Sequence, residues 1–164
     1  MKKITLLLIV LSIIFVGCSS SKDDTYDYEK LMGNKYLLSD ESYLVLNEDK
    51  TFKWYKTKED LKDNYYYGHY TVYRGENAIK YISEDLAIYD LTEKKQREYI
   101  AGDTNISIDM YFSLNLYNEY AIVNGLKKEL SSYTHFYGTT DGNYQEYKMI
   151  NMLNSNYGFF TLEE

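Results

Sequence analysis

Two short segments near the start of the chain show the alternation of apolar and polar residues that is typical of strands. Tyr43–Leu46 is mainly apolar, and Thr51–Tyr55 places Phe52 and Trp54 on one face. The residues between them, 47–50, read Asn-Glu-Asp-Lys, a composition common in turns. A period of two residues on either side of such a turn predicts a β-hairpin.

The longest alternation covers residues 106–117. Its even positions are all apolar and its odd positions are polar or tyrosine. This pattern predicts one long strand with a single buried face. A tight turn is expected at 118–119. Further strands are expected at 65–73, 120–123, 133–139, 144–152 and 156–162, the first ended by Arg74-Gly75 and the third and fourth separated by a turn at 141–143.

A helical period interrupts the strand pattern between residues 76 and 101. Ala78, Ile79, Ile82 and Leu86 are spaced to lie on one face of a helix. Thr92 is a suitable N-cap and Gly102 a suitable helix stop. The pattern predicts one or two short helices inserted among the strands.

Eight or nine short sequential strands predict a mainly β protein. The expected fold is an antiparallel meander closing into a lipocalin-like barrel, because closure removes the unpaired edges that invite aggregation. The inner face is predicted to include Phe52, Trp54, Ile108, Met110, Phe112 and Leu114. A barrel of about eight strands can fill its interior or hold one small ligand.

The opening of this domain supports the same fold by resemblance. The segment LMGNKY at 31–36, followed by YLVLNEDKTFKWY at 43–55, resembles the start of small lipocalin-like bacterial lipoproteins. Gly33 takes the glycine position of that motif, and Lys35 stands where a tryptophan is common. The resemblance covers about fifty residues and implies a fold rather than an activity.

A continuous apolar run at 4–16 precedes the alternating part of the chain and follows Lys2 and Lys3. As a helix it would be roughly 20 Å long, whereas a bilayer core is about 30 Å thick. The run is therefore too short for a comfortable permanent span, and it is typical of a secretory signal peptide.

The end of this run, Phe15-Val16-Gly17-Cys18, resembles the lipobox of bacterial lipoproteins. The resemblance implies that Cys18 carries a diacylglycerol and that residues 1–17 are removed. Residues 18–28 would then be the lipidated cysteine and a flexible tether, and 29–164 a single β-barrel-like domain. Cys18 is the only cysteine, so it has no internal disulfide partner. We expect a protein anchored to the cell membrane that faces outside the cytoplasm.

Composition narrows the range of partners. The net charge of the whole chain is −7 at pH 7, and no basic run is present. Because nucleic-acid binding needs clustered Lys and Arg, we expect no nucleic-acid partner. The chain contains 21 tyrosines, and tyrosine suits half-buried positions on strands because an apolar ring ends in a polar hydroxyl.

The candidate ligand-binding residues are aromatic or apolar residues predicted on strands. The densest aromatic segment is Tyr65-Tyr66-Tyr67-Gly68-His69-Tyr70. Its rings could line a barrel mouth, or they could pack the core and form cross-strand pairs. The ligand-binding candidates are Trp54, Tyr66, Tyr70, Met110 and Phe112.

Metal sites and cofactors are not expected. His69 and His135 are the only histidines, and a zinc site would need both of them plus a carboxylate; we interpret both as surface residues. Asp103, Asn105, Ser107 and Asp109 have the spacing of a calcium loop, but Ile108 stands where that loop needs glycine. We interpret them as the polar face of a strand.

The sequence contains no recognisable catalytic motif, neither Gly-x-Ser-x-Gly nor a phosphate-binding glycine loop nor His-Glu-x-x-His. We therefore predict a protein that is not an enzyme. The leading hypothesis is a lipid-anchored, extracytoplasmic binding module for a small apolar or aromatic ligand. The alternative is a module for protein–protein interaction at the cell envelope.

Overall fold

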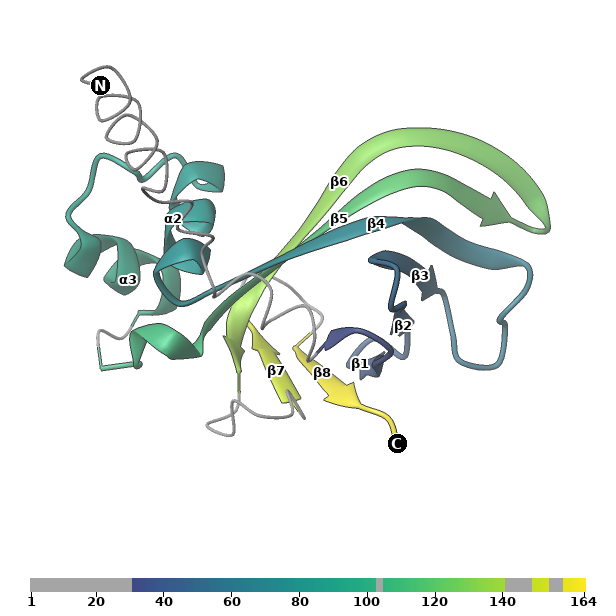
Figure 1. Ribbon diagram of the computed structural model, residues 1–164, viewed down its shortest axis with the longest axis horizontal. Coiled ribbons are helices and arrows are strands. Elements are labelled where there is room, and N and C mark those ends of the chain that lie inside the picture. The colour runs from purple at the N-terminus through teal and green to yellow at the C-terminus, as the bar shows by residue number, and fades with distance from the viewer. Residues whose placement is uncertain (1–30, 103–104, 141–148, 154–157) are drawn as a thin grey trace, which may run out of the picture.

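The computed structural model describes residues 31–102, 105–140, 149–153 and 158–164. These residues form a closed antiparallel barrel of eight strands, with two helices placed outside it (Figure 1). The strands are β1 Lys35–Leu38, β2 Tyr43–Leu46, β3 Thr51–Tyr55, β4 Asn64–Arg74, β5 Tyr111–Val123, β6 Leu126–Thr140, β7 Met149–Met152 and β8 Phe159–Leu162.

Each strand pairs with the next along the chain, and β8 pairs with β1 to close the barrel. Tyr36 lies opposite Leu162 at this closure, and Leu38 lies opposite Phe160. The predicted fold class, an antiparallel meander closing into a lipocalin-like barrel, is therefore confirmed.

The helical insertion is also confirmed. Helix α2 covers Gly75–Asp85 and helix α3 covers Glu93–Ala101. Thr92 is the N-cap residue of α3, and Gly102 ends that helix with a positive φ of 68°. A left-handed residue at this place is the usual way to end a helix, and glycine adopts it without steric cost.

Two separate apolar clusters hold the molecule together. The larger one fills the barrel with side chains from all eight strands, and its fully buried members include Tyr36, Leu44, Phe52, Phe136 and Phe160. The second lies outside the barrel, where Ala78, Ile79 and Ile82 of α2 pack near Tyr111 of β5. The insertion therefore covers part of the outer face of the barrel.

The prediction of one strand over 106–117 was wrong at its first half. Residues Ile108–Met110 form a short 3₁₀ turn, and β5 begins at Tyr111. Ile106 and Ile108 pack against the second cluster, under the helices, instead of facing the barrel interior. The alternation was misleading because Ile106 and Ile108, which contact the helical insertion, have the same two-residue spacing as Phe112 and Leu114, which face the barrel interior.

The inner-face prediction was consequently right for one group of residues and wrong for another. Phe52, Phe112 and Leu114 are buried in the barrel core, and Trp54 packs against it. Ile108 and Met110 precede the strand and do not belong to that core. On the other face of β5, Tyr111 and Ser113 are also fully buried, because α2 covers them.

The turn expected at 118–119 is a β-bulge. β5 continues through these residues to Val123, with register shifts against β4 between Tyr67 and Gly68 and against β6 between Asn118 and Tyr120. A Cβ placed on Gly68 would lie 1.8 Å from the carbonyl oxygen of Tyr117. Glycine is required there because the two backbones approach too closely for any side chain.

Strand β6 is longer than predicted, because it starts at Leu126 instead of 133. Its first seven residues are almost all exposed, and the β5–β6 hairpin extends as a curved arm beyond the barrel body (Figure 1). Pairing with β5, not an apolar pattern, makes this segment a strand. β7 and β8 confirm strands within the ranges predicted at 144–152 and 156–162; residues 144–148 and 156–157 of those ranges lie outside the described residues. The signal, tether and Cys18 predictions and the turn at 141–143 lie outside the described residues.

Candidate functional site

A pocket with a volume of about 590 Å³ opens at one end of the barrel. Its walls come from the β1–β2 turn, the end of β3, the start of β4 and the end of β5. In an antiparallel meander these four places lie at the same end of the barrel. We call it the end pocket; its lining residues are Asp40, Glu41, Ser42, Trp54, Tyr55, Lys56, Thr57, Asn64, Tyr65, Tyr66, Ala121, Ile122 and Val123.

Trp54 is held in place from two directions. Its indole Nε1 donates a hydrogen bond of 2.9 Å to Ser42 Oγ. From the core, Phe136 makes an edge contact with the indole, with ring centroids 5.4 Å apart and planes at 81°. Such pairs contribute about 0.5–1.5 kcal/mol beyond the buried area. The indole is therefore preorganised at the boundary between the core and the pocket.

Tyr66 provides the second aromatic wall. It lies opposite Trp54 across the β3–β4 pair, and the two ring centroids are 5.6 Å apart with planes at 34°. Tyr66 is 44% exposed, whereas most of Trp54 is covered. An exposed ring beside a fixed, half-buried ring is a surface on which an apolar or aromatic molecule can lie.

Tyr55 and Tyr65 line the outer side of the end pocket and form a row with Tyr43. Centroid separations are 6.4 Å for Tyr43–Tyr55 and 5.3 Å for Tyr55–Tyr65. Burial, and secondarily the neighbouring Tyr65 and Tyr43, raises the pKa of Tyr55 above its ordinary value of 10.0. Tyr55 is therefore a neutral phenol at physiological pH.

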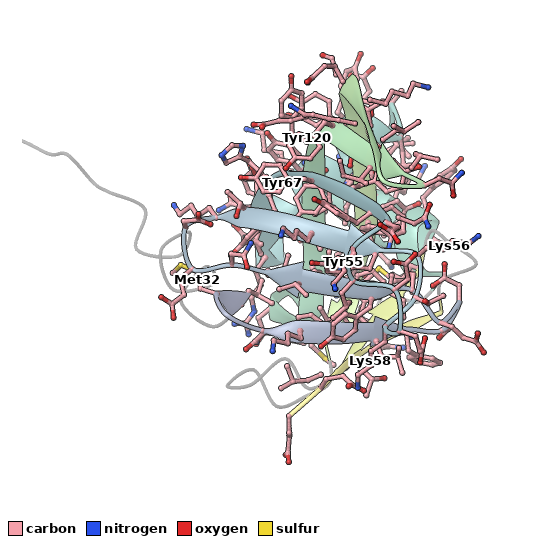
Figure 2. All side chains as sticks on the ribbon, turned by 90° about the vertical axis from the view of Figure 1, so that its right-hand side faces the viewer. Met32, Tyr55, Lys56, Lys58, Tyr67 and Tyr120 are labelled. Atoms are coloured by element: carbon pink, nitrogen blue, oxygen red, sulfur yellow. The ribbon has the colours of Figure 1, made fainter. Side chains whose placement is uncertain are left out.

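The charged groups around the end pocket are distributed unevenly. Asp40 and Glu41 lie on the β1–β2 turn, and Lys56 follows β3. Figure 2 shows Lys56 at the right-hand edge of the molecule and Tyr55 near the centre of the view. Asp60 lies near this lysine. Its pKa is below the ordinary value of 3.8, first because Asn64 donates to its carboxylate, then because of backbone N–H groups, and to a smaller extent because of Lys56.

The structure brings two of the five predicted ligand-binding residues together and separates the other three from them. Trp54 and Tyr66 line the end pocket. Tyr70 is 2% exposed and Phe112 is fully buried, so both are core residues. Met110 lies in the 3₁₀ turn before β5, which begins near the helical insertion. A ligand in the end pocket would contact neither Tyr70 nor Phe112.

Sequence reasoning missed the polar part of this site. Asp40 Oδ1 accepts hydrogen bonds from the backbone N–H of Ser42 at 3.1 Å and from its hydroxyl at 2.6 Å. An Asp two residues before a Ser at a strand end is a common turn signal, and it was the available clue. Its position beside Trp54 depends on the pairing of β2 with β3, which no local pattern reveals.

A second polar constellation, also missed, joins the helical insertion to the barrel. His135 Nδ1 lies 3.0 Å from Asp85 Oδ2 on α2, and His135 Nε2 lies 2.8 Å from Ser113 Oγ on β5. Because a carboxylate can only accept, Nδ1 carries the hydrogen of the first contact. In the neutral ring Nε2 then accepts a hydrogen bond from Ser113.

This Ser113–His135–Asp85 chain has the connectivity of a catalytic triad, but its surroundings do not suit a nucleophile. Ser113 is fully buried beneath α2. β5 is paired on both sides at this residue, so its backbone N–H groups are committed to the sheet instead of forming an oxyanion hole. We therefore assign a structural role to this Ser113–His135–Asp85 hydrogen-bond chain: it holds α2 against the barrel.

The two histidines thus differ in their environments. His69 is exposed and contacts Glu119 at 2.6 Å across the bulge. His135 has a side chain that is only 12% exposed, so its interpretation as a surface residue was wrong. Among the described residues, no group of three or more His, Cys, Asp or Glu could hold a metal ion. Asp103, the first residue of the calcium spacing, lies outside the described part of the chain.

Comparisons with known proteins add no assignment. No protein-family model matches the chain, and neither a curated protein nor a solved structure matches it significantly. In the described ranges, no helix is both long enough and apolar enough to cross a membrane.

Proposed function

We propose that this protein is a non-catalytic binding module for a small apolar or aromatic molecule, displayed outside the cytoplasm from a lipid on Cys18. The observation that carries the binding proposal is the end pocket with its two aromatic walls, Trp54 and Tyr66. Its volume of about 590 Å³ lies within the range of roughly 300–1,000 Å³ usual for small-molecule sites.

The filled centre of the barrel restricts where a ligand can lie. Phe52, Phe136 and Phe160 are buried side chains of the barrel core. The pocket instead lies at the end of the barrel, where Ala121, Ile122 and Val123 of β5 form an aliphatic wall. The proposal therefore concerns a shallow site at one end, with part of the ligand open to solvent.

Trp54 is the only tryptophan, so its fluorescence reports on the end pocket directly. We expect 2-phenylethanol, titrated into the detergent-solubilised full chain, to change the Trp54 emission along a saturable curve. Tyr66→Ala should weaken binding about tenfold, the equivalent of a lost aromatic contact of about 1.4 kcal/mol. Tyr99→Ala, a change at a 66% exposed tyrosine on α3, is the matched control. A linear, non-saturable response in all three proteins would refute the proposal.

The anchor proposal is supported by the lipobox resemblance at residues 15–18 and by the short apolar run before it. Acyl chains contribute about 0.8 kcal/mol per buried methylene, and two or more chains hold a protein stably on a membrane. Mass spectrometry of the protein extracted from membranes should show loss of residues 1–17 and addition of acyl chains. An intact Met1 with an unmodified Cys18 would contradict it, as would membrane retention of a processed Cys18→Ala chain.

A second candidate function, protein–protein interaction, is favoured by tyrosine pairs that join neighbouring strands among β4, β5 and β6. Tyr67 and Tyr120 stack with centroids 4.8 Å apart and lie next to each other in Figure 2. Tyr117 and Tyr133 are 5.0 Å apart, and Tyr133 is 75% exposed. Tyrosine is enriched at interfaces. Crosslinking on intact cells through a photoreactive residue at position 133 should yield one specific protein adduct if this function is correct, and no discrete adduct if it is not.

A further inference from the structure

The end pocket carries a charge pattern that the proposed function does not use. Two carboxylates, of Asp40 and Glu41, and one ammonium, of Lys56, line it. The charges of these groups and the aromatic rings beside them indicate which class of ligand the pocket can bind. The inference that follows rests on the proposed function, because it names the chemistry of the molecule bound in the same pocket.

A chain of hydrogen bonds connects the indole to the first carboxylate. Trp54 Nε1 donates to Ser42 Oγ at 2.9 Å, and Ser42 Oγ donates to Asp40 Oδ1 at 2.6 Å. Ser42 is 5% exposed, so the middle of this relay is buried, whereas Asp40 at its end is exposed. Because the indole N–H is already used, a ligand can interact with Trp54 only through the π-system, and the Asp40 carboxylate lies two hydrogen bonds from that ring.

The acidic groups of the pocket form no ion pair with the protein groups that the structure describes. Within the described part of the chain, Oδ2 of Asp40 and the carboxylate of Glu41 make no hydrogen bond or ion pair. Lys56 is exposed and lies close enough to Asp60 to lower the pKa of that carboxyl. The lining groups Asp40, Glu41 and Lys56 therefore leave one excess negative charge at the pocket, and Asp60 adds a further carboxylate near Lys56.

The chain as a whole strengthens this polarity. Its net charge is −7, which favours the approach of cations over that of anions. Aromatic faces also attract positive charge: a cation over Trp or Tyr gains about 0.5–2 kcal/mol, depending on how far it is desolvated. The rings and the carboxylates of this pocket favour the same kind of ligand.

We propose that the end pocket binds a small organic cation, an amine or quaternary ammonium attached to an apolar body. The cationic group lies between the Asp40 and Glu41 carboxylates and the faces of Trp54 and Tyr66. The apolar body rests on the wall formed by residues 121–123. An anionic ligand of the same shape would be disfavoured, because it would bind beside two carboxylates and only one ammonium.

The test compares three probes of similar size and different charge, 2-phenylethylammonium, 2-phenylethanol and phenylacetate, by Trp54 emission on the full chain in detergent at pH 7. We expect the cation to bind about tenfold more tightly than the alcohol, as a cation–π contact with a nearby carboxylate implies. Phenylacetate should bind more weakly than the alcohol.

Variants separate the charge from the shape of the pocket. Asp40→Asn keeps an oxygen acceptor for Ser42 and removes the charge, and Glu41→Gln removes the second charge. Each should reduce the preference for the cation over the alcohol, measured as the ratio of the two dissociation constants in the same variant. Asp90→Asn, in the loop between α2 and α3, changes the net charge equally and should have no effect.

The outcomes distinguish this inference from the function on which it rests. Equal affinity for the cation and the alcohol, or tighter binding of phenylacetate, would overturn the cation inference and leave a neutral binding pocket. A cation preference that persists in the Asp40→Asn/Glu41→Gln double variant would also overturn it. Absence of saturable binding by all three probes would overturn the proposed function itself.

Discussion

Single residues in the turns and beneath α2 hold this protein together through hydrogen bonds that the hydrophobic pattern does not reveal. Asp49, in the β2–β3 turn, accepts from the backbone N–H of Thr51 at 3.0 Å and from its hydroxyl at 2.6 Å. His135 bridges Ser113 and Asp85. In both cases one polar side chain fixes the relation between two segments.

The Asp49 turn predicts a defined pH dependence. Its hydrogen bonds from Thr51, the side-chain bond first, lower its pKa below the ordinary 3.8. A group with a depressed folded-state pKa contributes stability that is present above its unfolded pKa and lost as the pH falls through the folded value. Asp49→Asn should therefore reduce the fall in the free energy of unfolding as the pH drops below 3.8. Urea unfolding at a series of pH values measures this.

Asp90→Asn is the control, because its carboxylate lies in the α2–α3 loop and makes no hydrogen bond among the described residues. An unchanged pH profile for Asp49→Asn, identical to that of the control and of the unmodified protein, would show that the turn does not contribute to acid sensitivity.

The two histidines provide a matched pair for testing how α2 is docked. His135→Ala leaves the fully buried Ser113 hydroxyl without its partner, and an unsatisfied buried group costs about 1–3 kcal/mol. His69→Ala removes an exposed pair with Glu119, which is worth less than about 1 kcal/mol. Urea midpoints of both variants give the comparison. Equal destabilisation would mean that the Ser113–His135–Asp85 chain is not a structural link.

At the scale of elements, bulges and buried outer faces explain why strands extend beyond the segments that alternate. β5 runs from Tyr111 to Val123 because the backbones of β4 and β6 pair with it along its length. The bulge near Gly68 absorbs the register shift, so the strand does not end where its alternation does. Because β5 continues past the bulge, β5 and β6 form a long arm, and Val123 at the far end of β5 lines the end pocket.

The bulge predicts a large effect for Gly68→Ala. The added methyl would lie 1.8 Å from a backbone carbonyl oxygen, so the β4–β5 pair would have to move apart. We expect a loss of about 3 kcal/mol or more in the free energy of unfolding. Gly102→Ala, at a site with open space around it and a positive φ, should cost only about 1 kcal/mol. Similar urea midpoints for the two variants would contradict the close approach.

At the scale of the whole molecule, closure of the barrel depends on a strand of four residues at the end of the chain. β8 pairs with β7 and β1, and its Phe160 is fully buried against Phe136 at a centroid separation of 5.1 Å. The neighbouring Phe159 is 45% exposed. These two residues differ mainly in which side of the barrel wall they occupy.

Closure can be tested with these two phenylalanines. Phe160→Ala should destabilise the protein by about 3–5 kcal/mol, because a buried aromatic side chain is lost and a cavity remains. Phe159→Ala should change stability by less than about 0.5 kcal/mol, as is usual for surface substitutions. Thermal unfolding by circular dichroism provides both values. A small effect of Phe160→Ala would mean that the rest of the barrel is stable without this closure.

Much of the fold was predictable because the residues within most segments indicate by themselves whether the segment is a strand or a helix. The strands β2 and β3, the span of β4, the two helices and the residues Thr92 and Gly102 at the ends of α3 follow from period and from turn chemistry. The end pocket was predictable only in part: Trp54 and Tyr66 were candidates as aromatic strand residues. Asp40 and Ser42 were not, because their relation to Trp54 arises from strand pairing between residues twelve positions apart.

The sequence alone determined the meander, its helical insertion and the inward position of Phe52, Phe112 and Leu114, since each depends on the order of apolar and polar residues along one segment. The tertiary structure decided which of two buried environments an apolar residue occupies, the barrel interior or the cover beneath α2, because both produce the same alternation. It also decided the long reach of β5 and β6 and the gathering of Trp54, Tyr66 and Asp40 around one pocket. These features arise from contacts between distant strands, whose register is set by backbone pairing and not by local pattern.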